Sequence, residues 1–174
     1  MSNLEVSKKI IEDYAKGYYL EYTEVAKKLK DELSKICHKV APQAIVQTRP
    51  KSVSSFSEKV FRKSYSDPDK NMTDLCGGRI IVHATAEVEA VVKGIKTQYS
   101  ENIDYGNSVD NTQRLKSPEF GYRSVHYIIW LRSYQGNKVK HPRVELQIRT
   151  LLEHAWADIP HAYAYKSDFP IPDL

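Results

Sequence analysis

Apolar residues up to about position 40 recur at steps of three and four, which is the spacing of one face of a helix. They are Val6, Ile10, Tyr14, Tyr18, Val25, Leu29, Leu33 and Ile36. Gly17 weakens the middle of this segment, and Pro42 makes its continuation unfavourable. The pattern predicts one long amphipathic helix, or two helices in succession, over residues 4–40.

Shorter elements follow, because the apolar period changes and turn residues interrupt it. The expected elements are a strand at 44–48, a helix capped by Ser54 or Ser55 and ending near 63, a turn at 66–69, a strand at 79–83, a helix at 87–99, a polar loop at 101–120 with one edge strand near 103–105, strands at 124–131 and 139–149, and a helix from 151 towards 165 that Pro160 kinks or splits. This order predicts a single α/β (α+β) domain over residues 1–174, with a mixed sheet flanked by helices.

The strand at 139–149 has the clearest alternation in the chain. Val144, Leu146 and Ile148 fall on one face, and Glu145, Gln147 and Arg149 fall on the other. The polar face therefore presents these three polar or charged side chains in a row.

Composition narrows the class of protein. The 174 residues are 41% hydrophobic and 28% charged, which is typical of a globular domain. We find neither an apolar run long enough to span a bilayer nor a signal peptide, and the two cysteines indicate no disulfide scaffold. We therefore expect a cytoplasmic protein without membrane contact. The net charge of +4 suits polyphosphate ligands but does not indicate a nucleic-acid-binding protein.

Basic residues cluster around the predicted helix start at Ser55. Ser55, Lys59 and Lys63 share a helix face at four-residue steps, and Arg49 and Lys51 precede them. Ammonium groups beside a helix N-terminus form a suitable cradle for a triphosphate. The alternative interpretation is a solvated basic helix face.

Two carboxylates are candidates for metal binding. Asp74 stands before Gly77 and Gly78, at the mouth of a buried strand, and Glu145 lies on the polar face of its strand. Carboxylates suit Mg²⁺, and Glu145 could also accept a proton from a hydroxyl. Asp74 could instead cap a turn, and Glu145 could simply face solvent. Arg79 could stack on a base, grip phosphate or form a surface ion pair.

An aromatic candidate lies where a loop enters a strand. Gly121 permits a turn, after which Tyr122 could lie exposed as a platform for a base, with Ser124 and His126 on the same face. A core tyrosine and a structural histidine are the alternative.

Taken together, these segments resemble the synthetase domain of the RelA/SpoT family, over residues 45–166. The matching pieces are Arg49-Pro50-Lys51 with Ser55, Lys59 and Arg62-Lys63; residues 74–80; residues 121–126; and residues 144–150 running into Glu153-His154-Ala155-Trp156-Ala157, with His161 and Tyr165-Lys166 beyond. The resemblance implies a nucleotidyltransferase-like fold and a GTP pyrophosphokinase. Such an enzyme transfers the β,γ-pyrophosphate of ATP to the 3′-hydroxyl of GDP or GTP and makes (p)ppGpp.

The resemblance also implies roles for individual residues. The ATP-binding set would be Arg49, Lys51, Ser55, Lys59, Lys63 and Arg79, with the two arginines on either side of the adenine. Asp74 and Glu145 would bind Mg²⁺ and carry the catalysis. The acceptor-binding set would be Tyr122, Lys116, Arg123, His126, Gln147 and His154. Small members of the family also form homo-oligomers.

Four features depart from the family pattern. Thr48 replaces a glycine, residues 116–120 lack the usual Lys-Pro-Asn, Pro160 interrupts the last helix, and the sequence given stops soon after Lys166. The unusual loop at 116–120 keeps toxin-type relatives that modify the tRNA 3′ end or adenine nucleotides open as an alternative, and a catalytically silent nucleotide-binding module is another. A simple RNA-binding domain fits poorly, because no RNA-binding signature is present.

Overall fold

The computed structural model describes residues 3–65, 67–110, 124–135 and 138–166. In chain order the elements are α1 (Asn3–Asp13), the π-helical turn η1 (Tyr14–Tyr18), α2 (Tyr19–Val40), β1 (Ile45–Pro50), α3 (Val53–Lys63), α4 (Pro68–Asn71), β2 (Cys76–Val82), α5 (Thr85–Gln98), β3 (Val125–Trp130), β4 (Ser133–Gln135), β5 (Lys138–Lys140), β6 (Arg143–Thr150) and α6 (Leu151–Lys166).

The N-terminal segment is one continuous helical stretch with a change of winding in its middle. Gly17, predicted to weaken this point, lies in η1 between α1 and α2. Along α2 the buried residues follow the predicted spacing, with Val25, Leu29 and Leu33 facing the core. The observed segment is thus intermediate between the two predicted alternatives: it is one continuous helical stretch, but a π-helical turn divides it into α1 and α2.

Four strands form one mixed sheet in the order β1-β2-β6-β3. The β2–β6 pair is parallel, whereas the β1–β2 and β3–β6 pairs are antiparallel. A parallel pair requires a long crossover, and here α5 and β3 both lie in the chain between β2 and β6. A separate hairpin pairs β4 with β5. The predicted class, a mixed sheet flanked by helices, is confirmed.

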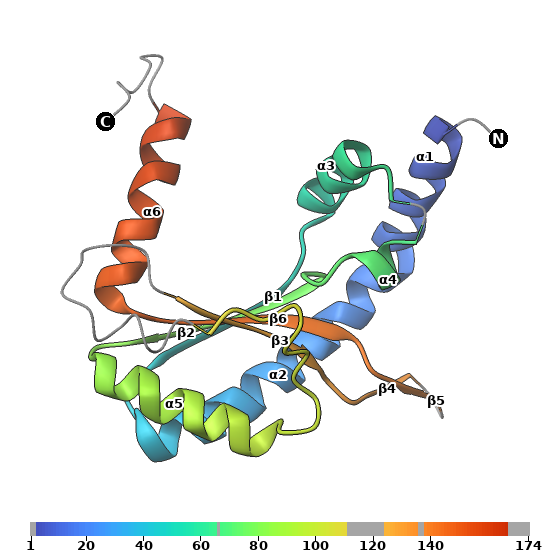
Figure 1. The fold of residues 1–174 in the computed structure, drawn as a ribbon. Helices are drawn as coiled ribbons and strands as arrows, with labels where there is room; N and C mark the ends of the chain where they lie inside the picture. Colours follow the sequence, from blue (N-terminus) through green and yellow to red (C-terminus); the bar gives the residue numbers. More distant parts are fainter. Residues whose placement is uncertain (1–2, 66, 111–123, 136–137, 167–174) are drawn as a thin grey trace.

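Helices α2 and α5 cover one face of the sheet, as Figure 1 shows. The side chains of Leu29, Ile80, Ile95 and Leu146 are fully buried between these layers. Burying one such aliphatic side chain contributes about 1.5–3 kcal/mol of stability. Gly78 allows α2 to pack closely against β2, because a Cβ atom at this position would lie 3.1 Å from Leu29 Cδ2 and 3.2 Å from Leu146 Cδ1.

Helices α3 and α6 rise from the opposite face, near the two ends of the sheet (Figure 1). Strand β6 runs directly into α6, and the junction is a capping box. Thr150 N donates to Glu153 Oε2 at 2.8 Å, and Glu153 N donates back to Thr150 Oγ1 at 3.2 Å. Between α3 and α6, this face of the sheet has no helix lying across it among the described residues.

Several predicted elements need correction. The cap of α3 is Ser52, whose hydroxyl accepts from Ser55 N, so Ser54 and Ser55 lie inside the helix. Residues 139–149 form two strands, because the chain breaks at His141-Pro142 and proline has no N–H for a ladder. The predicted turn at 66–69 overlaps the single helical turn α4.

Two further corrections concern the C-terminal half. Helix α6 is not split at Pro160, since its assignment runs unbroken from Leu151 to Lys166. Near 103–105 there is no strand, but Ile103 forms an isolated bridge to Ile129.

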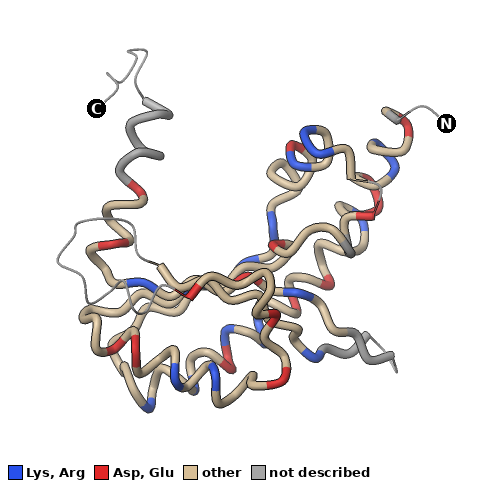
Figure 2. The backbone as a smooth tube through the Cα atoms, viewed as in Figure 1, with Lys and Arg blue, Asp and Glu red and all other residues tan. Residues whose placement is uncertain are grey.

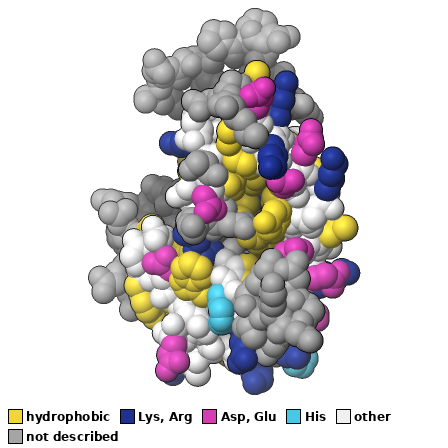
Figure 3. Space-filling model, turned by 90° about the vertical axis from the view of Figure 1, so that its right-hand side faces the viewer, with side chains coloured by type: hydrophobic (Ala, Val, Ile, Leu, Met, Phe, Trp, Pro, Cys, Tyr) yellow, Lys and Arg dark blue, Asp and Glu magenta, His cyan; other side chains and the backbone are white. Residues whose placement is uncertain are grey.

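The surface carries charges of both signs. Basic positions gather in α3 (Figure 2), and on the side drawn in Figure 3 an apolar band lies between interspersed acidic and basic side chains. Within the described part of the chain, no helix has the length and apolar character needed to cross a membrane.

Candidate functional site

The register of the sheet places the predicted site residues in two adjacent rows on its open face. Arg49 pairs with Gly77, which pairs with Glu145, which pairs with Ile128. The neighbouring row consists of Gln47, Arg79, Gln147 and His126. Because side chains alternate along each strand, both rows point to the same side. The predicted polar face of β6 is thereby confirmed.

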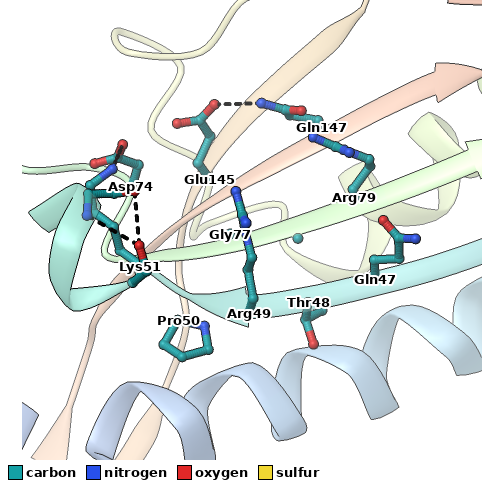
Figure 4. Close-up of a pocket in the computed structure, with 13 residues that line it drawn as sticks. Gln47, Thr48, Arg49, Pro50, Lys51, Asp74, Gly77, Arg79, Glu145 and Gln147 are labelled. Carbon is teal, nitrogen blue, oxygen red and sulfur yellow. Dashed lines mark hydrogen bonds and ion pairs between the residues drawn. The ribbon is translucent and has the colours of Figure 1, made fainter. Parts of the chain in front are cut away.

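These rows form the floor of a hollow of about 460 Å³. It lies where β1, β2 and β6 meet the start of α3, and its lining residues are Gln47, Thr48, Arg49, Pro50, Lys51, Ser52, Ser55, Asp74, Gly77, Gly78, Arg79, Glu145 and Gln147. In Figure 4 the Arg49 side chain extends past Gly77 towards Glu145. The hollow has the size of a typical small-molecule site.

Asp74 is the centre of a small charged cluster at one end of the hollow. Its carboxylate accepts from Lys51 Nζ at 2.8 Å and from Lys59 Nζ at 2.9 Å. Burial raises the pKa of Asp74, but the hydrogen bonds and charges of the two lysines outweigh burial and hold the pKa below its usual 3.8. Asp74 is therefore an anion at neutral pH, and this cluster of three groups has a net positive charge.

Glu145 is the second carboxylate of the hollow. Its Oε1 accepts from Gln147 Nε2 at 3.1 Å and lies 3.5 Å from His126 Nδ1. The contact with His126 is the largest influence on the pKa of Glu145, which is lowered from its usual 4.5 although burial and the charge of Asp74 oppose the change. Glu145 is thus ionised, within electrostatic range of Asp74, and held by neighbours on two strands.

The start of α3 forms one wall of the hollow. Ser52 caps the helix, and Ser55 lines the hollow with it. A helix N-terminus favours anions, because its first N–H groups and the helix dipole point towards them. Neither Lys59 nor Lys63 is among the lining residues. Lys59, one turn further on, reaches the hollow through its contact with Asp74, whereas Lys63 is exposed in the last turn.

Aromatic packing against the N-terminal helical stretch holds the start of α3 in place. Tyr14 of η1 stacks on Phe56 of α3 with ring centroids 3.8 Å apart and planes inclined by 7°. The Tyr14 hydroxyl also donates to the backbone oxygen of Lys51 at 2.7 Å. The position of Lys51 therefore depends on a residue from the N-terminal helical stretch.

Thr48, which departs from the glycine of the family pattern, is accommodated without loss of space. Its hydroxyl donates to the backbone oxygen of Ala26 in α2 at 2.8 Å. In Figure 4 its side chain points towards the helix and away from Arg49. The hydroxyl ties β1 to α2 instead of filling the hollow.

The predicted acceptor residues are only partly described. His126 and Gln147 lie in the second row, and His126 also contacts the Ser124 hydroxyl. His154, in the second turn of α6, contacts Arg149 and Asp158. Tyr122, Lys116 and Arg123 lie outside the described residues, so their roles stay predictions.

The donor set at the hollow fits one hard cation shared with a ligand. Within the described residues, no group of three or more His, Cys, Asp or Glu side chains could hold a metal ion alone. Mg²⁺ characteristically takes one or two carboxylates together with phosphate oxygens and water. Asp74 and Glu145 supply two carboxylates at one hollow, which matches that mode of binding.

Three further residues of this face and its surroundings, Ser52, Gln47 and Arg149, have no role predicted from the sequence. Ser52 could have been found as a cap, because it stands directly before the helical residues. Gln47 shares the alternating face of β1 with Arg49. The burial of Arg149 left no signal in the sequence, since an arginine that alternates with aliphatic residues usually faces solvent.

Comparison with known proteins gives the same picture. GTP pyrophosphokinase YwaC of Bacillus subtilis (strain 168) is 30% identical over 141 residues, covering 79% of this chain and 65% of YwaC. The chain therefore spans somewhat less than two thirds of that relative. The crystal structure of small alarmone synthetase 1 from Bacillus subtilis bound to its product pppGpp superposes with a TM-score of 0.73 and 27% identity, covering 92% of this chain and 84% of that one. The same synthetase bound to AMPCPP gives a TM-score of 0.70 and 26% identity, covering 92% of this chain and 83% of that one.

The family match rests on most of the chain. Residues 48–169 match the region found in RelA/SpoT proteins, and they contain both carboxylates, the lysine pair and the strand that carries Glu145. The similar structures share the mixed sheet and its flanking helices. By sequence and fold, this chain belongs to the RelA/SpoT family.

Proposed function

We propose that this protein is an ATP:nucleotide 3′-pyrophosphotransferase that makes (p)ppGpp from ATP and GDP or GTP. The observation that carries the proposal is the pairing of two ionised carboxylates, Asp74 and Glu145, with Lys51 and Lys59 at one hollow beside a helix N-terminus. Phosphoryl chemistry needs this combination, because charge on the phosphate oxygens must be neutralised while the attacking hydroxyl is oriented.

The donor half of the hollow suits ATP. Lys51, Lys59 and the start of α3 face one end, where they would bind the phosphate oxygens. Arg49 and Arg79 stand on neighbouring strands at the other end, where planar guanidinium groups would stack on the adenine. A similar protein supports a nucleotide ligand, since the crystal structure of small alarmone synthetase 1 contains bound AMPCPP.

Asp74 and Glu145 would hold Mg²⁺ through their carboxylate oxygens. When bound, the ion would neutralise phosphate charge and make the attacking hydroxyl more acidic. Asp74 would exchange its contacts with Lys51 and Lys59 for the ion, which would release both ammonium groups to the phosphates. The same residues thus serve the ligand-free and the loaded states.

In the reaction, the 3′-oxygen of the acceptor ribose attacks the β-phosphorus of ATP. The bond from the α,β-bridging oxygen to the β-phosphorus breaks, AMP leaves, and the β,γ-pyrophosphate remains on the acceptor. Glu145 takes the proton of the 3′-hydroxyl, and Gln147 and His126 orient its carboxylate. Such a reaction draws on ATP and guanine nucleotides, so we place the protein in the cytoplasm.

The test is a labelling experiment with all candidate acceptors in parallel. ATP carrying a labelled γ-phosphate is incubated with Mg²⁺, the protein and, separately, GDP, GTP, AMP, ADP, ATP or deacylated tRNA. We expect label on GDP and GTP and a matching release of AMP. Label only on tRNA or on adenine nucleotides would replace the acceptor with that of a toxin-type relative. ATP binding without transfer to any acceptor would indicate a silent nucleotide-binding module.

A further inference from the structure

Arg149 is the one residue on the polar face of β6 that is almost completely buried, with 2% of its surface exposed. Its Nη2 lies 2.7 Å from His154 Nδ1 and 3.8 Å from Asp158 Oδ1. Its Nε has no hydrogen-bond partner within the part of the chain that the structure describes. A buried guanidinium normally satisfies its donors, because leaving one unpaired costs free energy. The short contact to His154 is therefore the dominant described interaction of this side chain.

That contact dictates where the proton of His154 resides. A guanidinium is only a donor, so Nδ1 of His154 must accept, and the proton of the neutral ring must lie on Nε2. Asp158 opposes this arrangement, because its Oδ2 lies 3.4 Å from the same Nδ1 and would favour a proton there. Arg149 prevails, since its contact is shorter and buried, whereas the Asp158 side chain is 57% exposed.

The surrounding charges act in the same direction. Partial burial, then the charge of Arg149 and more weakly that of Arg79 in β2, lower the pKa of His154 below its usual 6.5. Asp158, one turn further along α6, raises it, but not enough to reverse the shift. The influence of Arg79, which lines the hollow, also places His154 within electrostatic range of the site.

We propose that Arg149 is a positioning residue that fixes His154 as the neutral Nε2–H tautomer, so that α6 presents a permanent hydrogen-bond donor to the acceptor nucleotide. The proposal rests on the proposed function for the identity of the ligand and for the place of His154 beside it. The buried contact also fastens the first two turns of α6 to β6, because Arg149 is the last but one residue of the strand and His154 and Asp158 belong to the helix. One side chain thus sets both the place of α6 and the hydrogen-bonding character of its histidine.

The first readout is spectroscopic and uses the ligand-free protein. In protein with ¹⁵N-labelled histidine, long-range ¹H–¹⁵N correlations identify the tautomer and titration gives the pKa, with His154→Gln used to assign the signals. The wild type should show a protonated Nε2 and a pKa below 6.5. Arg149→Met, which removes the donor, should shift the ring towards Nδ1–H paired with Asp158 and raise the pKa. Arg149→Lys, which keeps a charged donor, should retain the Nε2–H form.

The second readout separates acceptor binding from ATP binding. In Arg149→Met at pH 8, the acceptor KM should rise about two- to tenfold, the size expected for one lost hydrogen bond, while the KM for ATP stays unchanged. At pH 6 the defect should shrink, because a protonated ring carries a proton on Nε2 in either variant. Asp158→Asn is the matched control: the His154 pKa should fall further, and the acceptor KM should not change.

Each result decides a separate part of the proposal. A wild-type His154 protonated on Nδ1, or an Arg149→Met ring with unaltered tautomer and pKa, would overturn the positioning role whatever the activity. A shifted tautomer with an unchanged acceptor KM would overturn the link to the acceptor. If the wild type transferred pyrophosphate to none of the acceptors, the proposed function would fail, while the spectrum would still decide the role of Arg149.

Discussion

The two faces of the sheet divide the tasks of the protein between them. On the face under α2 and α5, Leu146 and its neighbours are fully buried and aliphatic, and even a glycine, Gly78, is enclosed by leucine side chains. On the face between α3 and α6, Glu145 and Gln147 are half-buried and charged or polar. One strand, β6, supplies both sets from alternate positions.

A small fold can hold charged groups partly out of water when neighbouring groups offset the cost of desolvation. Asp74 and Glu145 are anions kept partly out of water, and each lies beside cationic or hydrogen-bonding partners that reduce the cost. The apolar face supplies the stability that allows such groups to remain fixed before a ligand arrives. Substitutions on the two faces should therefore separate stability from activity.

The largest effect is expected at Glu145. Glu145→Gln keeps the shape of the side chain but removes the charge and the proton acceptor, so transfer should fall by about 10²–10⁴-fold. ATP binding should change little, because Gln147 and an amide at 145 can still form a hydrogen bond. Turnover and ATP binding measured on the same preparation test this. Turnover close to that of the wild type would remove Glu145 from the mechanism.

The neighbouring position should behave in the opposite way. Leu146→Ala leaves a void between α2 and the sheet, and we expect a loss of about 2–5 kcal/mol in the free energy of unfolding. Denaturant unfolding measures this loss, and the folded fraction should keep its kcat. If the KM for ATP rose while the unfolding free energy stayed constant, the division between the faces would be wrong.

The adjacent glycines offer a finer version of the same test. Gly78→Ala puts a methyl group within 3.1–3.3 Å of three leucine side-chain atoms, so stability should fall by about 1 kcal/mol or more. Gly77→Ala meets nothing closer than the Glu145 backbone oxygen at 3.9 Å, so stability should hold while the added methyl group narrows the hollow and raises the KM for ATP. Equal losses of stability at both positions would contradict the assignment of faces.

The smallest expected effect is on the pH dependence of stability in acid. The pKa values of Asp74 and Glu145 are lowered in the folded protein, so both carboxylates stabilise the fold above their usual values of 3.8 and 4.5. That contribution should disappear as the pH falls through the lowered values. Asp74→Asn cannot titrate at this position, so its unfolding free energy should fall less steeply than that of the wild type below about pH 4. Parallel slopes from pH 7 to 3 would show that the pairing of Asp74 with the lysines contributes no stability.

Much of this arrangement could be predicted from local pattern. Alternation in β6 assigned Glu145 and Leu146 to opposite faces, and three- and four-residue spacing located the buried side of α2. These features depend on periods of two and 3.6 residues, which a sequence displays directly. The break at Pro142 and the cap at Ser52 are also local signals, although the predicted strand runs through Pro142 and the predicted cap lies two or three residues after Ser52.

The features that the sequence does not reveal are contacts between residues that lie far apart along the chain. The order β1-β2-β6-β3 brings Asp74 and Glu145 to one hollow, although 70 positions separate them in the sequence. The pairing of Lys51 and Lys59 with Asp74, and the burial of Arg149 under α6, follow from that order and from the path of each side chain. No local period encodes such contacts.

The stack of Tyr14 on Phe56 shows that the folding unit begins earlier in the chain than the recognisable family motifs. The family match begins at residue 48, yet the ring that supports α3 and the hydroxyl that holds the Lys51 carbonyl come from residue 14. A fragment that begins at residue 48 would contain every candidate catalytic side chain. It would lack Tyr14, whose contacts with Phe56 and Lys51 support the start of α3. Grafting this site into another scaffold, or exchanging it between relatives, therefore requires the N-terminal helical stretch to travel with the motifs.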